Sequence, residues 1–430
     1  MVRALRHPNY RLFFCGQIVS LVGTWMTRVA TSWLVYRLTG SALLLGLVGF
    51  AGQIPSFLLA PFAGVLVDRW NRHRLLVVTQ ILAMIQSAAL ALLALTGWIQ
   101  LWHVLVLSVF QGLINAFDMP ARQAFVVEMV EKREDLSNAI ALNSSMVNAA
   151  RLLGPSIGGV VIAAVGEGWC FLGDAVSYLA VIASLLLMKI AARPPRPARE
   201  ARVLAALREG FIYVSRSAPI RSILLLLALV SLVGMPYTVL MPIFASQILH
   251  GGPHTLGFLM AATGVGALLG AVFLAGRRSV LGLGRIIPLT AGLFGAGLIG
   301  FSLSRTMWLS VPLLLVTGLG FMVQMASSNT LIQTLVDEDK RGRVMSFYTM
   351  AFMGMTPFGS LLAGSLAERI GAPHTLLLGG LGCVAGALAF AVLLPRLREE
   401  VRPIYIRMGI LPEVAGGLGN AAQLTVPPQD

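Results

Sequence analysis

The sequence contains little charge. Asp, Glu, Lys and Arg make up 12% of its 430 residues, whereas 57% of the residues are hydrophobic. A water-soluble domain carries about 25% charged residues, because these side chains cover its surface. The composition therefore excludes a soluble globular fold.

Cysteine and the motifs of common enzymes are scarce too. Cys15, Cys170 and Cys383 lie far apart inside apolar stretches, which fits neither a disulfide framework nor a metal site. The chain lacks the Gly-x-x-x-x-Gly-Lys-Ser/Thr loop that binds ATP, and its six histidines stand singly at loop positions. A membrane-embedded enzyme would need a convergent set of such groups. We therefore expect no enzymatic activity, no metal and no cofactor.

Long apolar runs are what the sequence has instead. A helix needs about 20 apolar residues to cross a bilayer, and the first run, which starts near Arg11, is too long for a signal peptide. Such runs occur six times before and six times after a polar interval: 12–36, 43–67, 75–95, 101–127, 139–165, 169–187, 223–249, 256–275, 286–303, 307–335, 344–366 and 375–394. The sequence predicts an all-α membrane protein with twelve transmembrane helices.

Basic residues gather on one side of these predicted helices. Outside the runs, only Arg37, Arg305 and Arg369 fall on the other side. By the positive-inside rule, the basic side and both termini are cytoplasmic. The basic clusters lie between apolar runs rather than along one exposed face, so the net charge of +14 does not predict nucleic-acid binding.

The polar interval divides the chain. Residues 1–190 are predicted to form one six-helix bundle and residues 220–395 a second. The interval 191–219 begins with an Arg- and Pro-rich stretch and continues with an amphipathic pattern, which indicates a cytoplasmic linker with an interfacial helix. Residues 396–430 are basic and then rich in Gly, Pro and polar residues, so we expect a disordered cytoplasmic tail.

The two halves resemble each other weakly. Val130-Glu131, ahead of the fifth run, corresponds to Val336-Asp337, ahead of the eleventh, and a charged turn follows each pair. This fits a parallel repeat, in which two pseudo-symmetric bundles are related by an axis along the membrane normal.

A charged loop follows the second run. Its Gly64, Asp68, Arg69 and Arg72 match the pattern Gly-x-x-x-Asp-Arg-x-Gly-Arg-Arg/Lys, and Asn71 takes the place of the second glycine. This loop resembles the signature of the major facilitator superfamily. The resemblance implies the major facilitator fold, with two pseudo-symmetric bundles of six helices and both termini in the cytoplasm.

In that family the loop latches the cytoplasmic gate. The resemblance places the Asp68 carboxylate opposite the start of the eleventh helix, where the helix dipole and Arg341 or Arg343 would attract it. The alternative is a solvated charge cluster that serves topology alone. The gate candidates are Gly64, Asp68, Arg69, Arg72, Arg341 and Arg343.

Further segments narrow the resemblance. They are residues 23–28 (GTWMTR), 115–122 (NAFDMPAR), 148–155 (NAARLLGP) and 341–344 (RGRV). Together they are similar to the bacterial branch that contains enterobactin exporters and macrolide efflux proteins. The similarity implies a monomeric, multi-pass protein of the bacterial inner (plasma) membrane that exports small amphipathic molecules, such as siderophores, macrolides or other drug-like compounds, in exchange for protons. A lipid or lysophospholipid translocator of the same fold is the alternative.

One position departs from many proton-driven drug exporters of the superfamily. Those exporters carry an arginine in the fourth helix, three residues before a Gln-Gly pair. Here Gln111-Gly112 is present, but Ser108 stands at the arginine position. Proton coupling through that arginine is therefore not supported.

Polar side chains recur along one face of several runs. An ionisable group at the bilayer centre costs about 2.5–3.5 kcal/mol, so each such group needs a partner or a water-filled cavity. Residues three or four positions apart share a helix face, and we predict that these stripes face a central cavity. The candidates for cargo binding or proton coupling are Gln17, Thr24, Arg28, Gln111, Asn115, Asp118, Arg122, Asn148, Arg151, Asp174, Tyr237 and Gln324.

Two interpretations stay open for the charged candidates. Arg28 either binds cargo or acts in gating, or else it pairs with Asp174 for structural reasons. For Asp118 and Asp174 a structural role competes with proton coupling. Asp118 lies four residues before Arg122, at a spacing that permits an ion pair along the helix.

Two further patterns concern packing. Gly154 and Gly158, four residues apart, predict a close approach of the fifth helix to a neighbour. Tyr237 and Gln324, in the seventh and tenth runs, have no charged neighbours in their helices, and the methionines beside them predict an apolar wall that suits varied cargo.

Overall fold

The computed structural model describes residues 3–130, 132–189, 203–277 and 279–408. All regular elements in these ranges are helices, and twelve helical spans are long and apolar enough to cross a membrane. The predicted number of spans is therefore confirmed.

Six spans form the first half of the molecule and six the second. The first half contains α1 (Pro8–Thr39), α2 (Ala42–Arg69), α3 (Arg72–Leu95), α4 (Leu101–Met129), α5 (Leu136–Val165) and α6 (Glu167–Leu187). The second half contains α8 (Ala218–Leu229) and α9 (Tyr237–Ile243) as one span, α10 (Pro253–Ala275), α11 (Leu283–Leu303), α12 (Met307–Leu335), α13 (Arg341–Thr349) and α14 (Met355–Ile370) as one span, and α15 (Ala372–Arg407). Short 3-10 helices lie at Arg3–Arg6 and Arg133–Asp135, and α7 (Val203–Arg216) precedes the second half.

The seventh and eleventh spans are not regular α-helices throughout. Each contains π-helical turns, at Val230–Gly234 and Phe244–Ile248 in the seventh and at Met350–Gly354 in the eleventh. In the seventh span, the Met235 N–H donates to the Val230 carbonyl oxygen, five residues back, at 3.0 Å. Pro236 follows directly and has no N–H to donate. Single π turns of this kind often mark functional positions in a helix.

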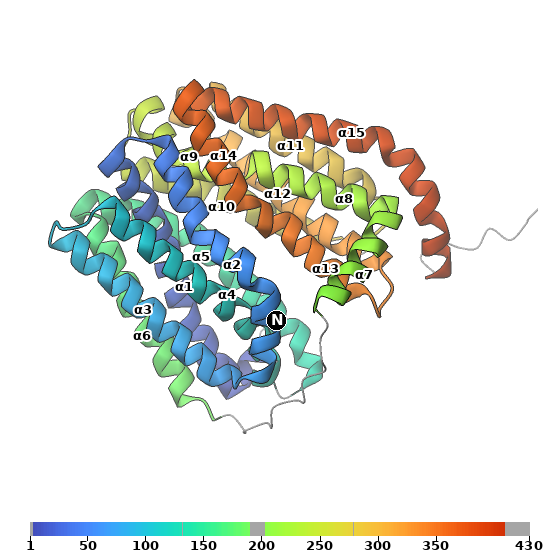
Figure 1. Ribbon diagram of the computed structural model, residues 1–430, viewed down its shortest axis with the longest axis horizontal. Coiled ribbons are helices and arrows are strands. Elements are labelled where there is room, and N and C mark those ends of the chain that lie inside the picture. The colour runs from blue at the N-terminus through green and yellow to red at the C-terminus, as the bar shows by residue number, and fades with distance from the viewer. Residues whose placement is uncertain (1–2, 131, 190–202, 278, 409–430) are drawn as a thin grey trace, which may run out of the picture.

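The helices run between two ends of unlike chemistry. At one, the tight-turn end, spans are joined by short connections that include glycines with positive φ, a conformation that only glycine adopts readily: Gly40, Gly97, Gly166 and Gly371. The opposite end, called the basic end, carries the connections that follow α2, α4, α10 and α12. Basic residues lie in or next to each of these connections: Arg69, Arg72, Lys132, Arg277, Lys340 and Arg341. Figure 1 shows α1–α6 gathered on one side of the molecule and α8–α15 on the other, with α7 beside α13.

The two halves meet through two matched glycine contacts near the tight-turn end. A methyl group added to Gly46 of α2 would lie 2.5 Å from a carbonyl oxygen of α14 and 3.0 Å from the Gly364 Cα. A methyl group added to Gly257 of α10 would lie 2.5 Å from a carbonyl oxygen of α5 and 3.0 Å from the Gly159 Cα. Gly46 and Gly257 are each the fifth residue of their helix. The halves therefore pack backbone to backbone at two equivalent positions.

The last helix is longer than the sequence analysis predicts. α15 continues to Arg407, past the expected start of the tail at residue 396 and through two internal prolines. The physical reason is an apolar stripe, because Leu397 is buried and both Val401 and Tyr405 pack on the core of the second half. Residues 409–430, which make up the rest of the predicted tail, lie outside the described residues.

Candidate functional site

Helix α1 lies at the centre of the molecule. It contacts α2, α4, α5 and α6 in its own half and α9 and α10 in the other. α5 approaches it at Gly154, where an added Cβ would collide with Trp25, and at Gly158, where an added Cβ would lie 3.1 Å from the Met26 Cα. The predicted close approach of the fifth helix is confirmed. Side chains of α1 thus reach the boundary between the halves.

Two arginines flank one indole ring at this boundary. The Arg28 guanidinium carbon lies 4.6 Å from the centroid of the Trp25 ring, and that of Arg151, on α5, lies 5.7 Å from it. Arg28 is exposed although six helices contact α1, so it faces an open space within the bundle. α5, which carries Arg151, also packs on α10 of the second half. Within the described residues, neither arginine has a carboxylate partner.

Asp174 of α6 is not the partner of Arg28. Its Oδ2 accepts hydrogen bonds from the hydroxyls of Thr27 at 3.0 Å and Ser87 at 2.7 Å, while its Oδ1 is buried without a partner. Asp174 itself is 1% exposed. The structural pairing of Arg28 with Asp174 is therefore not observed, and Asp174 is a buried carboxyl group that is held by hydroxyls alone.

Asp118 of α4 has a complete set of partners. Its Oδ1 accepts from the Thr79 hydroxyl at 2.9 Å and from the Gln80 amide at 2.7 Å, both on α3. Its Oδ2 pairs with Arg122 one turn along α4, as the spacing predicts. This network neutralises the carboxylate and joins α3 to α4, which favours a structural role for Asp118.

The remaining polar candidates fall into two groups. Thr24, Gln111 and Asn148 are half-buried and hydrogen-bond within their own helices, to Ser20, Asn115 and Ser144 respectively. In contrast, Gln17, Tyr237 and Gln324 are 2%, 3% and 0% exposed, so the apolar wall predicted from the seventh and tenth runs is packed rather than open in this conformation. Both amide atoms of Gln324 are buried without a partner, which is costly.

The predicted cytoplasmic gate is described in part. The structure describes the backbone of three of its members, as part of α2, but not the surroundings of their side chains: Gly64, Asp68 and Arg69. Arg72 binds Glu128 of α4 at 2.8 Å, and the half-buried Arg341 starts α13. A latch between Asp68 and the eleventh span therefore stays a prediction.

Helix α7, which lies within the predicted linker, docks on the start of the eleventh span. Glu209 binds Arg343 at 2.5 Å, and the Tyr213 hydroxyl donates to Asp337 at 3.3 Å. The Lys340 ammonium lies 5.0 Å from the centroid of the Tyr213 ring. Burial against the second half raises the pKa of the Tyr213 hydroxyl above its usual value. These contacts attach α7 to the second half.

The sequence analysis, which selected candidates by polarity, did not predict several residues of the site. Trp25 lies one turn before Arg28 on α1, and only this spacing hints that the ring supports the guanidinium. Ser87 on α3 and Thr27 on α1 bind Asp174, and neither hydroxyl is distinguished from other polar residues by the sequence. Within the described ranges, no three His, Cys, Asp or Glu side chains gather as a metal site requires.

The architecture defines a class of protein. Twelve helical spans in two halves, with polar groups at the boundary, form a multi-pass membrane transporter of the major facilitator type. The fold is shared with the nucleoside transporter NupG, at a TM-score of 0.72 and 13% identity, over 91% of this chain and 100% of that chain. A bacterial homologue of the human lysosomal transporter Spinster aligns at a TM-score of 0.69 and 15% identity, over 91% and 97% of the two chains. The predicted fold is confirmed.

Within this class the chain belongs to the family of transmembrane secretion effectors, whose model matches residues 2–405. The staphyloferrin A transporter of Staphylococcus aureus is 25% identical over 91% of this chain and 98% of its own. The multidrug efflux pump Tap of Mycolicibacterium fortuitum is 30% identical over 93% and 98%. Macrolide efflux protein A of Streptococcus pyogenes is 23% identical over 92% and 98%. The resemblance drawn from the sequence motifs is confirmed, and the protein is a membrane transporter of small molecules.

Proposed function

We propose that this protein exports small amphipathic molecules across the bacterial inner membrane, as a monomer with both termini in the cytoplasm. The relatives support export, since their names give staphyloferrin A transport, multidrug efflux and macrolide efflux. The two halves rock about a central site in alternating access. In the present conformation the glycine contacts hold the tight-turn end together. Cargo then enters from the basic, cytoplasmic end.

The arginine pair at Trp25 is the observation that supports a cargo class. Two like charges in a low-dielectric bundle are unfavourable unless an anion lies beside them. A guanidinium donates two parallel hydrogen bonds to a carboxylate, and the exposed side chain of Arg28 leaves room for such a group. The indole ring offers a flat apolar surface beside it. The site therefore suits cargo that joins a carboxylate or another anionic group to an apolar body.

Asp174 supports proton coupling better than Asp118 does. A carboxyl group that is buried among hydroxyls has no cation to hold it ionised, and so it is able to bind and release a proton as its surroundings change. Asp118, in contrast, is paired with Arg122. We therefore assign the coupling proton to Asp174.

Everted membrane vesicles test the proposal. A fluorescent aromatic carboxylate and its uncharged methyl ester serve as probes, and a proton gradient is applied across the vesicle membrane. We expect the acid to accumulate and the ester not to accumulate. Arg28→Gln and Arg151→Gln should each lower accumulation of the acid about tenfold, since a hydrogen bond to a charged group contributes about 1.5–3 kcal/mol.

The matched control is Arg369→Gln, which removes an exposed arginine at the tight-turn end and should leave accumulation unchanged. Equal accumulation of acid and ester would contradict the assigned cargo class. Movement of a labelled lysophospholipid, with no movement of any acid, would favour the lipid translocator instead.

A further inference from the structure

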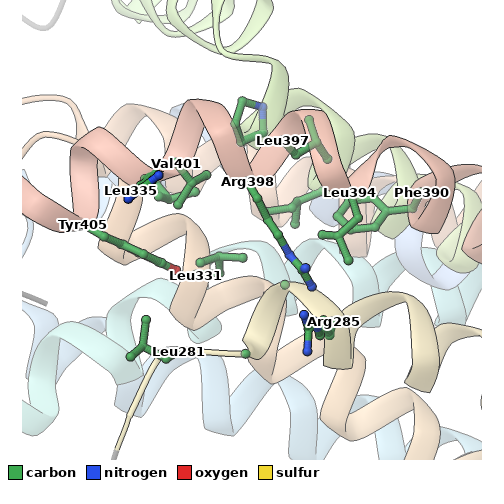
Figure 2. Close-up of a pocket in the computed structure, with 15 residues that line it drawn as sticks. Leu281, Arg285, Leu331, Leu335, Phe390, Leu394, Leu397, Arg398, Val401 and Tyr405 are labelled. Carbon is green, nitrogen blue, oxygen red and sulfur yellow. The ribbon is translucent and has the colours of Figure 1, made fainter. Parts of the chain in front are cut away.

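A groove opens at the basic end of the second half, away from the arginine pair at Trp25. Its walls are the starts of α8 and α11, the end of α12 and the last turns of α15 (Figure 2). The groove has a volume of about 410 Å³. The helices that line it, α8, α11, α12 and α15, make none of the main contacts with the first half, so the groove is separate from the boundary at which the halves meet.

Most of the lining is apolar, and the charge that it carries is of one sign. Arg285 of α11 and Arg398 of α15 extend into the groove from opposite walls (Figure 2), and Arg402 also lines it. No acidic residue lines the groove. In the described part of the chain, the side chains of these three arginines have neither an ion pair nor a hydrogen bond. The groove is thus a cationic rim above an apolar floor.

The groove lies at the depth of the lipid headgroups. Arg285 is in the first turn of a span, and Leu335 is the last residue of another. The final turns of α15 leave the apolar span but keep Leu397 and Val401 against the protein, as an interfacial helix does. Guanidinium groups at this level meet phosphates, while the apolar floor below meets acyl chains.

We propose that this groove binds an anionic glycerophospholipid. The lipid phosphate lies between Arg285 and Arg398, with Arg402 beside it, and one acyl chain follows the surface formed by Ile223, Leu331 and Leu394. Charge complementarity supports an anionic lipid. The headgroup of a zwitterionic lipid contains a positive charge, which the three arginines of the groove would repel. Basic pockets between helices at the cytoplasmic face are the usual sites of anionic lipids.

Native mass spectrometry and thermal unfolding of the purified full-length protein test the proposal. Phosphatidylglycerol and phosphatidylcholine with identical acyl chains are titrated separately. We expect phosphatidylglycerol to bind more tightly and to raise the Tm further. Arg285→Gln/Arg398→Gln should weaken phosphatidylglycerol binding about fivefold for each arginine removed, with no change for phosphatidylcholine.

Two variants serve as controls. Arg396→Gln/Arg407→Gln removes the same charge from exposed positions of α15 outside the groove and should keep the lipid preference. Arg285→Lys/Arg398→Lys keeps the positive charge and should retain most of the preference for phosphatidylglycerol. This variant separates a loss of lipid binding from a loss of folding. Equal affinity for both lipids, equal losses in the groove and control variants, or full replacement of the lipid effect by inorganic phosphate would each overturn the proposal.

Discussion

Gly364 of α14 lies directly against Gly46 of α2, with no room for a side chain on either residue. A methyl group on Gly364 would lie 2.6 Å from the Ala42 carbonyl oxygen. Forced overpacking of this kind costs about 1–3 kcal/mol. We expect Gly364→Val to weaken the contact and to raise the population that is open at the tight-turn end.

Spin labels at positions 38 and 369 measure this shift as a longer distance between the two halves. Both positions are exposed at the tight-turn end. Gly173→Val is the control, because an added Cβ at Gly173 has no neighbour within 4 Å. A distance distribution that matches wild type would show that the glycine contact does not hold this end closed.

Trp25 supports both arginines, so its ring should influence cargo affinity. A cation–π contact is worth about 0.5–2 kcal/mol. We expect Trp25→Leu to weaken binding of the fluorescent carboxylate and Trp25→Phe to weaken it less, because phenylalanine keeps an aromatic face. Fluorescence titration of the purified variants gives the two Kd values. Identical values for leucine and phenylalanine would argue that the ring acts only by filling space.

Asp118 should matter for stability. Removing one member of a buried ion pair leaves the other uncompensated, at a cost of about 3–5 kcal/mol, and the partial exposure of Arg122 places the effect at the lower end. We expect Asp118→Asn to lower the Tm measured by intrinsic fluorescence. Asp118→Asn/Arg122→Gln should recover part of the loss, and a double variant less stable than the single one would refute the account.

Asp174 should matter for coupling. Asn has nearly the shape of a protonated Asp but cannot release a proton. We expect Asp174→Asn to abolish the acceleration of transport by a pH gradient, while exchange of labelled for unlabelled cargo continues. Rates in proteoliposomes at matched and unequal pH test this. If the gradient still accelerates the variant, another group carries the proton.

The orientation of the chain is testable on cells. After replacement of Cys15, Cys170 and Cys383 by serine, a cysteine at Thr96 should react with an impermeant maleimide on intact cells. A cysteine at Ser279, in a basic loop, should react only after permeabilisation. The reverse pattern would place the basic end outside and reverse the proposed direction of entry.

The spans and the polar stripes could be read from the sequence, because burial in lipid imposes a length and helical periodicity imposes a face. The neighbour of each side chain could not. Arg28 and Asp174 both lie on inward faces, yet Thr27 takes the Asp174 carboxylate, since a stripe does not give the rotation of one helix against the next. The pair of Asp118 with Arg122 was predictable because both residues lie on one helix.

Conformation was also beyond the sequence. Tyr237 and Gln324 were expected at an open wall, and both are packed in this structure. Which polar residues are exposed to water depends on the relative orientation of the two halves. The same sequence adopts more than one such orientation during transport, so the sequence alone does not give the exposure. The extension of α15 was missed for a simpler reason, because Pro395 and a run of charges concealed the apolar stripe that begins at Leu397.

The guanidinium groups beside Trp25, which have no carboxylate partner in the described part of the chain, also bear on the return step of the proposed cycle. After cargo has left, the vacant carrier must cross between its two conformations with both positive charges facing each other. A small counter-ion such as chloride, or a second molecule of cargo, would screen them during that step. Turnover should therefore depend on the anion supplied in the medium, and counterflow should outpace net release.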